Sequence, residues 1–230
     1  ALFSDIHGNL EALEAIIADI GNNYDDVIFL GDAIGLGPNP KECINLLHKH
    51  NIRWILGNHD LYYLYGVDKF NIEEEKLPHY AWVHSMLDGN DREILSKYDI
   101  SYELNINNHK LLFSHYFIEN KDYLYPFYSI GYIKNSTISN ILKISNCDYF
   151  FYGHEHNPSI YKFNDKYLVD VGSSGCVKTD KTFYTIVEID DEINIKRKEI
   201  TYDRAKLINK LNNSTYDSIE IIKKDFFGIE

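Results

Sequence analysis

The sequence predicts an α/β fold, and three observations predict it. Within the first sixty residues, three short apolar runs are each followed by a polar block and a helical pattern. From residue 101 the pattern changes to strand-like segments, with Asn107-Asn108 as a plausible hairpin turn. The 230 residues contain no linker and no low-complexity run. We therefore expect one domain over 1–230, with its functional loops at the carboxyl ends of the strands.

Strands and helices are expected to alternate in the first part of the chain. The three short apolar runs are the predicted strands, over 1–5, 27–30 and 52–56. A helix is predicted over 10–20, with Asn9 as its N-cap and Gly21 as its stop. Pro38 and Pro40 open a second helix that continues to about His50.

The remainder of the chain combines a helical stretch, a β-rich stretch and a helical tail. Residues 61–100 are predicted to be helical and partly polar, with Pro78 at a helix start. The later predicted elements are a helix over about 136–145, strands at 110–113, 148–152 and on both sides of Asn164-Asp165, and a hairpin over about 183–200. The tail, 203–230, is expected to be a helical extension packed on the domain, with Ala205, Leu207, Ile208 and Leu211 on one face.

Short polar blocks end five of the apolar, strand-like runs. They contribute Asp5 and His7, then Asp32, then Asn58, His59 and Asp60, then His115, and finally His154 and His156. Carboxylate, imidazole and amide side chains of this kind hold pairs of divalent cations in proteins. A single histidine near a strand end is usually a satisfied polar residue, but five such blocks together indicate a dinuclear metal site. The five other histidines are interpreted as structural or solvated.

The spacing and chemistry of these residues suit phosphoester hydrolysis. Asp5-x-His7 and His154-x-His156 lie just beyond strand ends, where the chain turns, so two adjacent metals can share each pair. The two oxygens of Asp32 can bridge cations about 3.5–4 Å apart. The mixed nitrogen and oxygen set favours manganese, iron, zinc or cobalt over calcium or magnesium. A water between two such cations has its pKa lowered from 15.7 toward roughly 7.

Composition excludes some classes of partner. The net charge of −12 argues against general nucleic-acid binding, although two cations at the site would still attract a small phosphorylated substrate. No apolar run approaches the roughly 20 residues that span a membrane. Cys43, Cys147 and Cys176 are odd in number and far apart, which favours a cytoplasmic protein with its thiols as small core residues. The chain opens without Met inside a predicted strand, so we expect a few residues to precede it.

In their order along residues 5–156, the blocks resemble the pattern of the calcineurin-like metallophosphoesterases. The pattern is Asp-x-His, Gly-Asp, Gly-Asn-His-Asp/Glu, His and Gly-His-x-His. The resemblance implies a four-layer α/β/β/α sandwich. It also implies in-line attack by metal-bound hydroxide, with His59 as general acid. The implied ligands are Asp5, His7, Asp32 and His156 for one metal, and Asp32, Asn58, His115 and His154 for the other.

Two positions depart from the protein-phosphatase branch of this family. That branch and the symmetrical diadenosine tetraphosphatases carry a phosphate-gripping arginine shortly after Gly-Asp, and the matching position here is Leu36. In the protein phosphatases an Asp before that arginine supports the catalytic histidine, and Gly35 stands there. The chain is thus more similar to small bacterial phosphoesterases that act on diesters. Asp60 is a candidate residue for orienting His59.

We therefore expect a phosphodiesterase with two divalent metal ions that acts on a small phosphorylated substrate, for which a nucleotide-like molecule is a candidate. A phosphomonoesterase or a diadenosine polyphosphate hydrolase is the alternative enzyme. A non-catalytic scaffold on the same fold is the alternative of another class, and the retromer scaffold subunit, which lacks the catalytic histidine, is an example. The presence of His59 beside all seven implied ligands favours an enzyme. The sequence is compatible with an oligomer.

Overall fold

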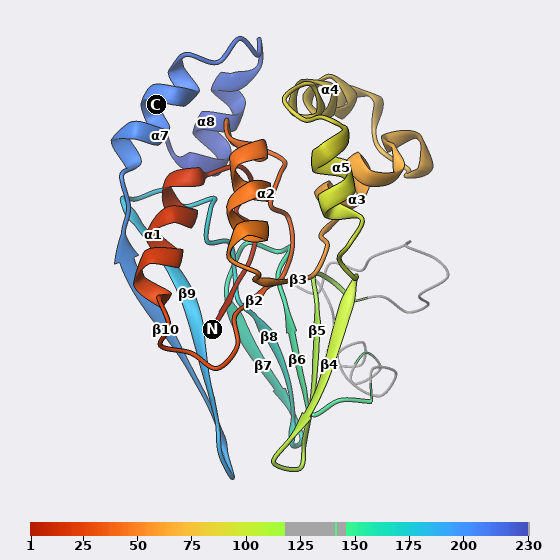
Figure 1. Cartoon of the computed structure of the whole chain (residues 1–230), viewed down its shortest axis with the longest axis vertical. Helices are drawn as coiled ribbons and strands as arrows, with labels where there is room; N and C mark the ends of the chain where they lie inside the picture. Colours follow the sequence, from red (N-terminus) through yellow and green to blue (C-terminus); the bar gives the residue numbers. More distant parts are fainter. Residues whose placement is uncertain (118–140, 142–145, 230) are drawn as a thin grey trace.

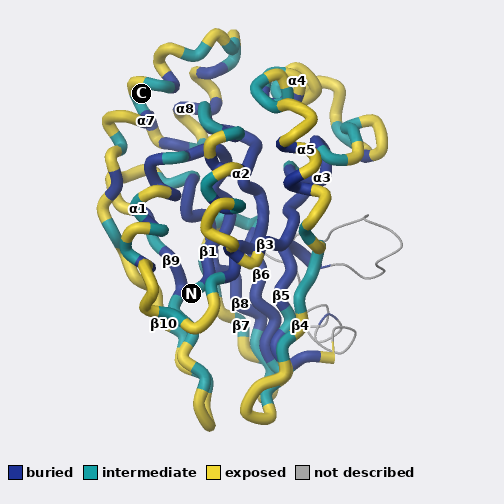
Figure 2. The backbone as a smooth tube through the Cα atoms, in the orientation of Figure 1, coloured by how far each residue is buried: buried dark blue, intermediate teal, exposed yellow. Residues whose placement is uncertain are grey.

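Two five-stranded sheets face each other in the computed structural model, which describes residues 1–117, 141 and 146–229 (Figure 1). The first sheet has the order β10 (Ile193–Thr201), β9 (Lys181–Ile189), β1 (Leu2–Phe3), β2 (Ile28–Phe29) and β3 (Arg53–Trp54). The second has the order β4 (Ser101–Ile106), β5 (His109–Ser114), β6 (Tyr149–Tyr152), β8 (Lys166–Asp170) and β7 (Ser159–Phe163). Buried apolar residues of both sheets, including Ile28, Phe113 and Phe151, form the core between them (Figure 2).

Parallel pairing aligns the loops that carry the polar blocks. β1, β2 and β3 are parallel neighbours, and so are β5, β6 and β8. Parallel neighbours end at the same edge of their sheet, so the blocks that follow them along the chain become neighbours in space. The strands predicted over 1–5, 27–30 and 52–56 are shorter than expected, because the chain turns into these loops directly after two paired residues.

Helices α1 (Leu10–Ile20) and α2 (Pro40–Lys49) cover the outer face of the first sheet (Figure 1). The predicted start of α1 is confirmed, because the Asn9 side chain accepts a hydrogen bond from the Ala12 N–H, and Gly21 follows the last residue. The Asn9 amide also donates to Gly175 O at 2.7 Å, which ties this cap to the loop after β8.

A helical segment follows β3 at the end of the molecule where the loops gather (Figure 1). It consists of α3 (Asn58–Tyr65), the short 3-10 turns η1 (Val67–Lys69) and η2 (Glu74–Lys76), α4 (Leu77–Ser85) and α5 (Gly89–Leu95). Pro78 lies in the first turn of α4, as predicted. Asp88 separates α4 from α5 and caps α5, since its side chain accepts from the Asn90 and Asp91 N–H groups.

The C-terminal tail forms α7 (Arg204–Asn212) and α8 (Ile219–Phe227), which pack on the first part of the chain. Leu207, Leu211 and Phe227 are fully buried. The Lys210 ammonium lies 2.6 Å from the buried Glu11 carboxylate of α1. Buried apolar contacts and a shielded ion pair anchor the tail to the domain.

The predicted α/β fold class is confirmed by the two facing sheets and the helices around them. The helix predicted over about 136–145 lies outside the described residues, apart from Ile141, which packs with Phe150 on the outer face of the second sheet. None of the helices in the described part of the chain has the length and apolar character needed to cross a bilayer.

Candidate metal centre

Strained backbone marks the loops that follow the strands. Five candidate residues have positive φ angles: Asp5 (53°), His7 (48°), Asp32 (59°), His154 (73°) and His156 (58°). Such a conformation costs on the order of 1–3 kcal/mol for a residue other than Gly, so the surrounding structure must impose it. Backbone hydrogen bonds between the loops do so, as in Asp5 N–H to Gly31 O and His7 N–H to Asp32 O, both 2.9 Å.

The first cluster of side chains surrounds Asp5. The Nε2 atoms of His156 and His7 lie 3.2 and 3.6 Å from Asp5 Oδ1. These two nitrogens are themselves 2.9 Å apart. Two imidazole nitrogens at this distance share a proton, or they both point at a cation. All three residues are contributed by loops, after β1 and after β6.

The second cluster surrounds Asp32 and adjoins the first. His115 Nε2 lies 3.3 Å from Asp32 Oδ2, and His7 Nε2 lies 3.7 Å from the same oxygen. His154 Nδ1 lies 2.9 Å from Asn58 Oδ1. The Asp32 carboxylate therefore lies between the two clusters, the position required of a bridging ligand.

Backbone carbonyl groups orient two of the histidine rings. His7 Nδ1 lies 3.1 Å from Ile34 O, and His115 Nδ1 lies 2.7 Å from Leu30 O. A ring that donates from Nδ1 to a carbonyl presents an unprotonated Nε2 to a metal. Both Nε2 atoms face the aspartates, so the donor set fits a pair of borderline divalent cations.

Protonation equilibria in the metal-free protein agree with this donor set. Although burial opposes it, the neighbouring Asp32 and Asp5 carboxylates raise the pKa of His115 to about 9. Despite its burial, Asp5 has a pKa well below its usual range, because His115 and His156 lie beside it. The cluster thus attracts positive charge, which protons supply until cations displace them.

His59 lies at the same site with one ring nitrogen unpaired. Its backbone N–H donates to Asp32 Oδ1 at 2.9 Å, which fixes the start of α3 beside the clusters. Its Nδ1 is buried and has no hydrogen-bond partner among the residues that the structure describes. Burial lowers the pKa of His59 well below its usual value. One nitrogen of His59 is also within 4.8 Å of ligand atoms of His7 and Asp32.

Gly35 packs closely against the His59 ring. A Cβ at Gly35, whose φ is +142°, would lie 2.7 Å from His59 Nδ1 and 2.6 Å from His7 Nδ1. No side chain fits there without displacing both rings. The absence of the supporting Asp of the protein phosphatases therefore follows from the packing of this loop.

Asp60 lies behind the site and holds its loops together. The fully buried carboxylate accepts hydrogen bonds from the N–H groups of Asp32 (2.9 Å), Ala33 (3.1 Å) and Gly57 (3.0 Å). These bonds join the loops after β2 and β3. That Asp60 orients the His59 ring stays a prediction. Asp60 would act through the backbone that it holds, because its carboxylate bonds these three N–H groups.

A cavity of about 710 Å³ opens above the two clusters. Its floor contains His7, Asp32, Asn58, His59, His154 and His156. One wall comes from η2 and α4, and the opposite wall comes from the C-terminal tail. His79 lines the α4 wall and bonds Gly35 O, a structural contact that ties α4 to the loop after β2. Lys76 also lines this wall, whereas Arg53 is paired with Asp26 on the surface, outside the cavity lining.

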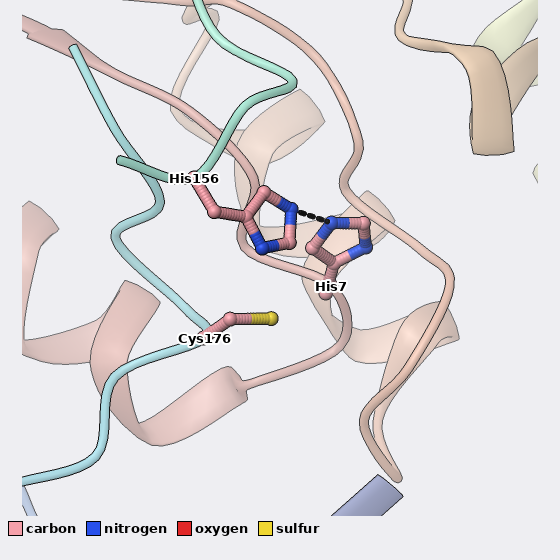
Figure 3. A group of neighbouring side chains, drawn as sticks. All are labelled: His7, His156 and Cys176. Carbon is pink, nitrogen blue, oxygen red and sulfur yellow. Dashed lines mark hydrogen bonds between the residues drawn. The ribbon is translucent and has the colours of Figure 1, made fainter. Parts of the chain in front are cut away.

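Cys176 lies beside the first cluster, a placement that the sequence reasoning missed (Figure 3). Its sulfur, with a ring nitrogen of His7 and of His156, forms a group of potential ligand atoms within 4.8 Å of one another. It was interpreted as a small core residue because no second cysteine lies near it in sequence. The available signal was its place in Gly172-Ser173-Ser174-Gly175-Cys176, a further block directly after a strand.

Comparisons with known proteins agree with the fold and with the order of the blocks. A family model described as the calcineurin-like phosphoesterase superfamily domain matches residues 1–192. The uncharacterized protein MJ0912 of Methanocaldococcus jannaschii is 32% identical over 241 residues, covering 92% of this chain and 90% of that protein. The crystal structure of the hypothetical protein PH1004 from Pyrococcus horikoshii OT3 matches with a TM-score of 0.80 at 19% identity, covering 99% and 97% of the two chains.

A shorter match involves a named enzyme. The symmetrical bis(5′-nucleosyl)-tetraphosphatase of Neisseria gonorrhoeae is 36% identical over 64 residues, which cover 26% of this chain and 23% of that protein. The likeness to PH1004 shows the fold, and the match to the tetraphosphatase is confined to 64 residues.

Proposed function

The chain belongs to the calcineurin-like phosphoesterase superfamily and is a metal-dependent phosphoric ester hydrolase, and from this premise we propose that it hydrolyses phosphodiesters with two divalent cations. The observation that carries the proposal is the position of Asp32 between two histidine-containing clusters. Asp5, His7, Asp32 and His156 would hold one cation, and Asp32, Asn58, His115 and His154 the other. Manganese, iron, zinc and cobalt suit this nitrogen and oxygen set.

The chemistry divides between the cations and the chain. A bound pair of cations would acidify a water and neutralise charge on the phosphoryl oxygens. The chain's own contribution is the placement of His59, whose ring lies at the floor of the cavity. We assign it the role of general acid, which protonates the leaving oxygen on the side opposite the attacking water. Burial lowers the pKa of the His59 ring in the free protein, so the ring would gain its proton when a phosphate anion binds beside it and raises that pKa.

Leu36 supports a diester over a monoester as substrate. A monoester dianion usually calls for a guanidinium fork, and the corresponding position here is an apolar side chain that is 5% exposed. Leu36 packs against Leu207 and Ile222 of the tail, so its apolar character follows from the tail that covers it. Lys76 is the ammonium group on the described lining of the cavity, and it is paired with Glu73 at 2.6 Å.

A diadenosine polyphosphate hydrolase is the second candidate. The local identity to a symmetrical bis(5′-nucleosyl)-tetraphosphatase favours it, and it would make the substrate nucleotide-like. Under both candidate functions the substrate is a small phosphorylated molecule. Family membership supports a hydrolase over a scaffold. A cytoplasmic location and an oligomer stay predictions.

Two artificial substrates with the same leaving group separate a phosphodiesterase from a phosphomonoesterase. Metal-free protein would be reloaded with manganese, iron, zinc or cobalt, and the bound metal counted by mass spectrometry. We expect a higher kcat/KM for bis(para-nitrophenyl) phosphate than for para-nitrophenyl phosphate under the same metal and pH, with phosphoproteins as poor substrates. A clear preference for the monoester would contradict the diester assignment and support a phosphomonoesterase.

A further inference from the structure

The second wall of the cavity belongs to a part of the chain that the family model does not include. That model ends at residue 192, whereas α7 and α8 lie at 204–227. Tyr216, Ser218, Ile221, Ile222 and Phe226 of this tail line the cavity. The tail therefore lies over the metal ligands without supplying one of the candidate ligands.

Aromatic rings connect the tail to both the floor and the opposite wall. The Tyr216 ring stacks on Trp82 of α4, with centroids 4.9 Å apart and planes inclined by 12°. It also contacts the His79 ring at 5.8 Å. Phe226 lies with its centroid 6.3 Å from that of His156. Because the tail contacts α4 and a candidate metal ligand, its position at the site is defined by packing on both sides.

Ile221 is the exposed apolar residue of this wall. Its side chain is 61% exposed, whereas its neighbour Ile222 is 4% exposed and belongs to the tail core. Among the large hydrophobic residues described as exposed, which also include Tyr65, Leu77, Ile106 and Ile160, Ile221 lines the cavity. A large apolar side chain open to water inside a concave site indicates a surface that a ligand covers.

We propose that Ile221, Tyr216 and Phe226 form a subsite for an aromatic group attached to the scissile phosphate, such as a nucleobase. The inference rests on the proposed function, because the metal clusters fix where the phosphate lies. The apolar wall and the floor of candidate metal ligands line one cavity of about 710 Å³, so a group attached to a phosphate on the floor would lie against the wall. This volume is in the range of pockets that enclose ligands of nucleotide size. Planar rings on both walls favour a planar occupant.

The experiment compares two diesters that share a leaving group and differ in the group retained on phosphorus. They are the para-nitrophenyl ester of thymidine monophosphate and methyl para-nitrophenyl phosphate. The wild type should prefer the thymidine ester. Ile221→Ala should lower that preference by roughly three- to tenfold, because it removes apolar surface that the base would cover. Ile160→Ala is the matched control, since Ile160 is 55% exposed and lies on β7, away from the cavity lining.

A binding measurement makes the inference independent of turnover. Calorimetry would compare thymidine monophosphate with methyl phosphate on the metal-loaded protein. We expect tighter binding of thymidine monophosphate and a smaller difference in Ile221→Ala than in Ile160→Ala. Equal binding of the two ligands by the wild type, or an unchanged difference in Ile221→Ala, would overturn the inference. Selective binding without hydrolysis of either diester would instead overturn the proposed function alone.

Discussion

The Nδ1 side of the His156 ring faces the sulfur of Cys176, while His156 Nε2 lies 3.2 Å from Asp5 Oδ1 (Figure 3). The two nitrogens of the His156 ring point in different directions. Nε2 points to the metal-ligand cluster, and Nδ1 points to the Cys176 sulfur. Although burial opposes it, Cys176 and Asp5 raise the pKa of His156 well above its usual value in the metal-free protein. Cys176 is thus placed to orient His156 through Nδ1.

We predict that Cys176→Ala weakens metal binding by roughly tenfold, because a second residue that orients a ligand typically contributes that much. The wild-type protein loaded with cobalt should already lack the strong near-ultraviolet absorption that a cobalt–thiolate bond produces. Cys176→Ser should retain most of the affinity, since its hydroxyl can still accept from the ring. Cys43→Ala, on α2, is the control for loss of a thiol. A cobalt–thiolate band that disappears only in the Cys176 variants would show that the sulfur is a ligand.

The grouping of the candidate ligands in space could be predicted from the sequence, because each block follows a strand within a few residues. Asp5, Asp32 and Asn58 follow parallel neighbours of one sheet, and this topology alone brings them to one edge. The helix caps at Asn9 and Gly21 are also local signals, which depend on a few adjacent residues. The length of the strands was overestimated, since apolar residues continue into loops whose backbone pairing has already ended.

The tail wall could not be predicted, because it depends on packing between distant segments. The sequence predicts an apolar face on 203–226 but not which surface of the domain that face covers. Leu36 is an example. From the sequence, its apolar side chain was interpreted only as the absence of a phosphate-binding arginine. The structure adds that Leu36 is part of the core beneath α8. Cys176 was missed for the same reason, because it lies twenty positions after His156 in the sequence.

The position of Asp32 leads to a prediction about metal content. Asp32→Ala should lose much of its bound metal and its hydrolytic activity, because both clusters lose their shared anion. In the wild type the His59 N–H donates to Asp32 Oδ1. Asp32→Asn keeps an oxygen that can accept this hydrogen bond but removes the negative charge. It should therefore fold like the wild type and still bind less metal. Mass spectrometry of the purified variants measures the metal, and near-normal metal with normal turnover in both would exclude the dinuclear assignment.

The role of His59 is separable from metal binding by its leaving-group dependence. His59→Ala should keep its metal and lose roughly 10²–10⁴-fold in rate, because a general acid contributes about this much. The loss should be smaller for para-nitrophenyl esters than for alkyl esters, since nitrophenolate leaves without a proton. Because one nitrogen of His59 is within reach of His7 and Asp32, the metal content must be measured on the same sample. Lost metal, or an equal rate loss for all leaving groups, would contradict the role.

Asp170 gives a prediction about pH and stability. This residue of β8 is buried, and its Oδ1 accepts a hydrogen bond from the Gly172 N–H at 2.7 Å. Burial raises the pKa of Asp170 to about 8, so the folded protein retains a proton that the unfolded chain releases near the usual carboxyl pKa. The contribution of this group to stability is therefore complete at acidic pH, falls as pH rises toward about 8 and is constant above that value.

Asp170→Asn removes this titration and keeps an oxygen that can accept from Gly172. Relative to the variant, the metal-free wild type should lose stability as pH rises from about 5 to 8, by at most roughly 1.4 kcal/mol per pH unit. Urea unfolding of both proteins over this range measures the difference. Metal must be absent, because cations beside Asp5 and His156 would stabilise the ionised carboxylate and lower its pKa. A difference in unfolding free energy that does not change with pH would show that Asp170 is already ionised in the folded protein at the acidic end of the range.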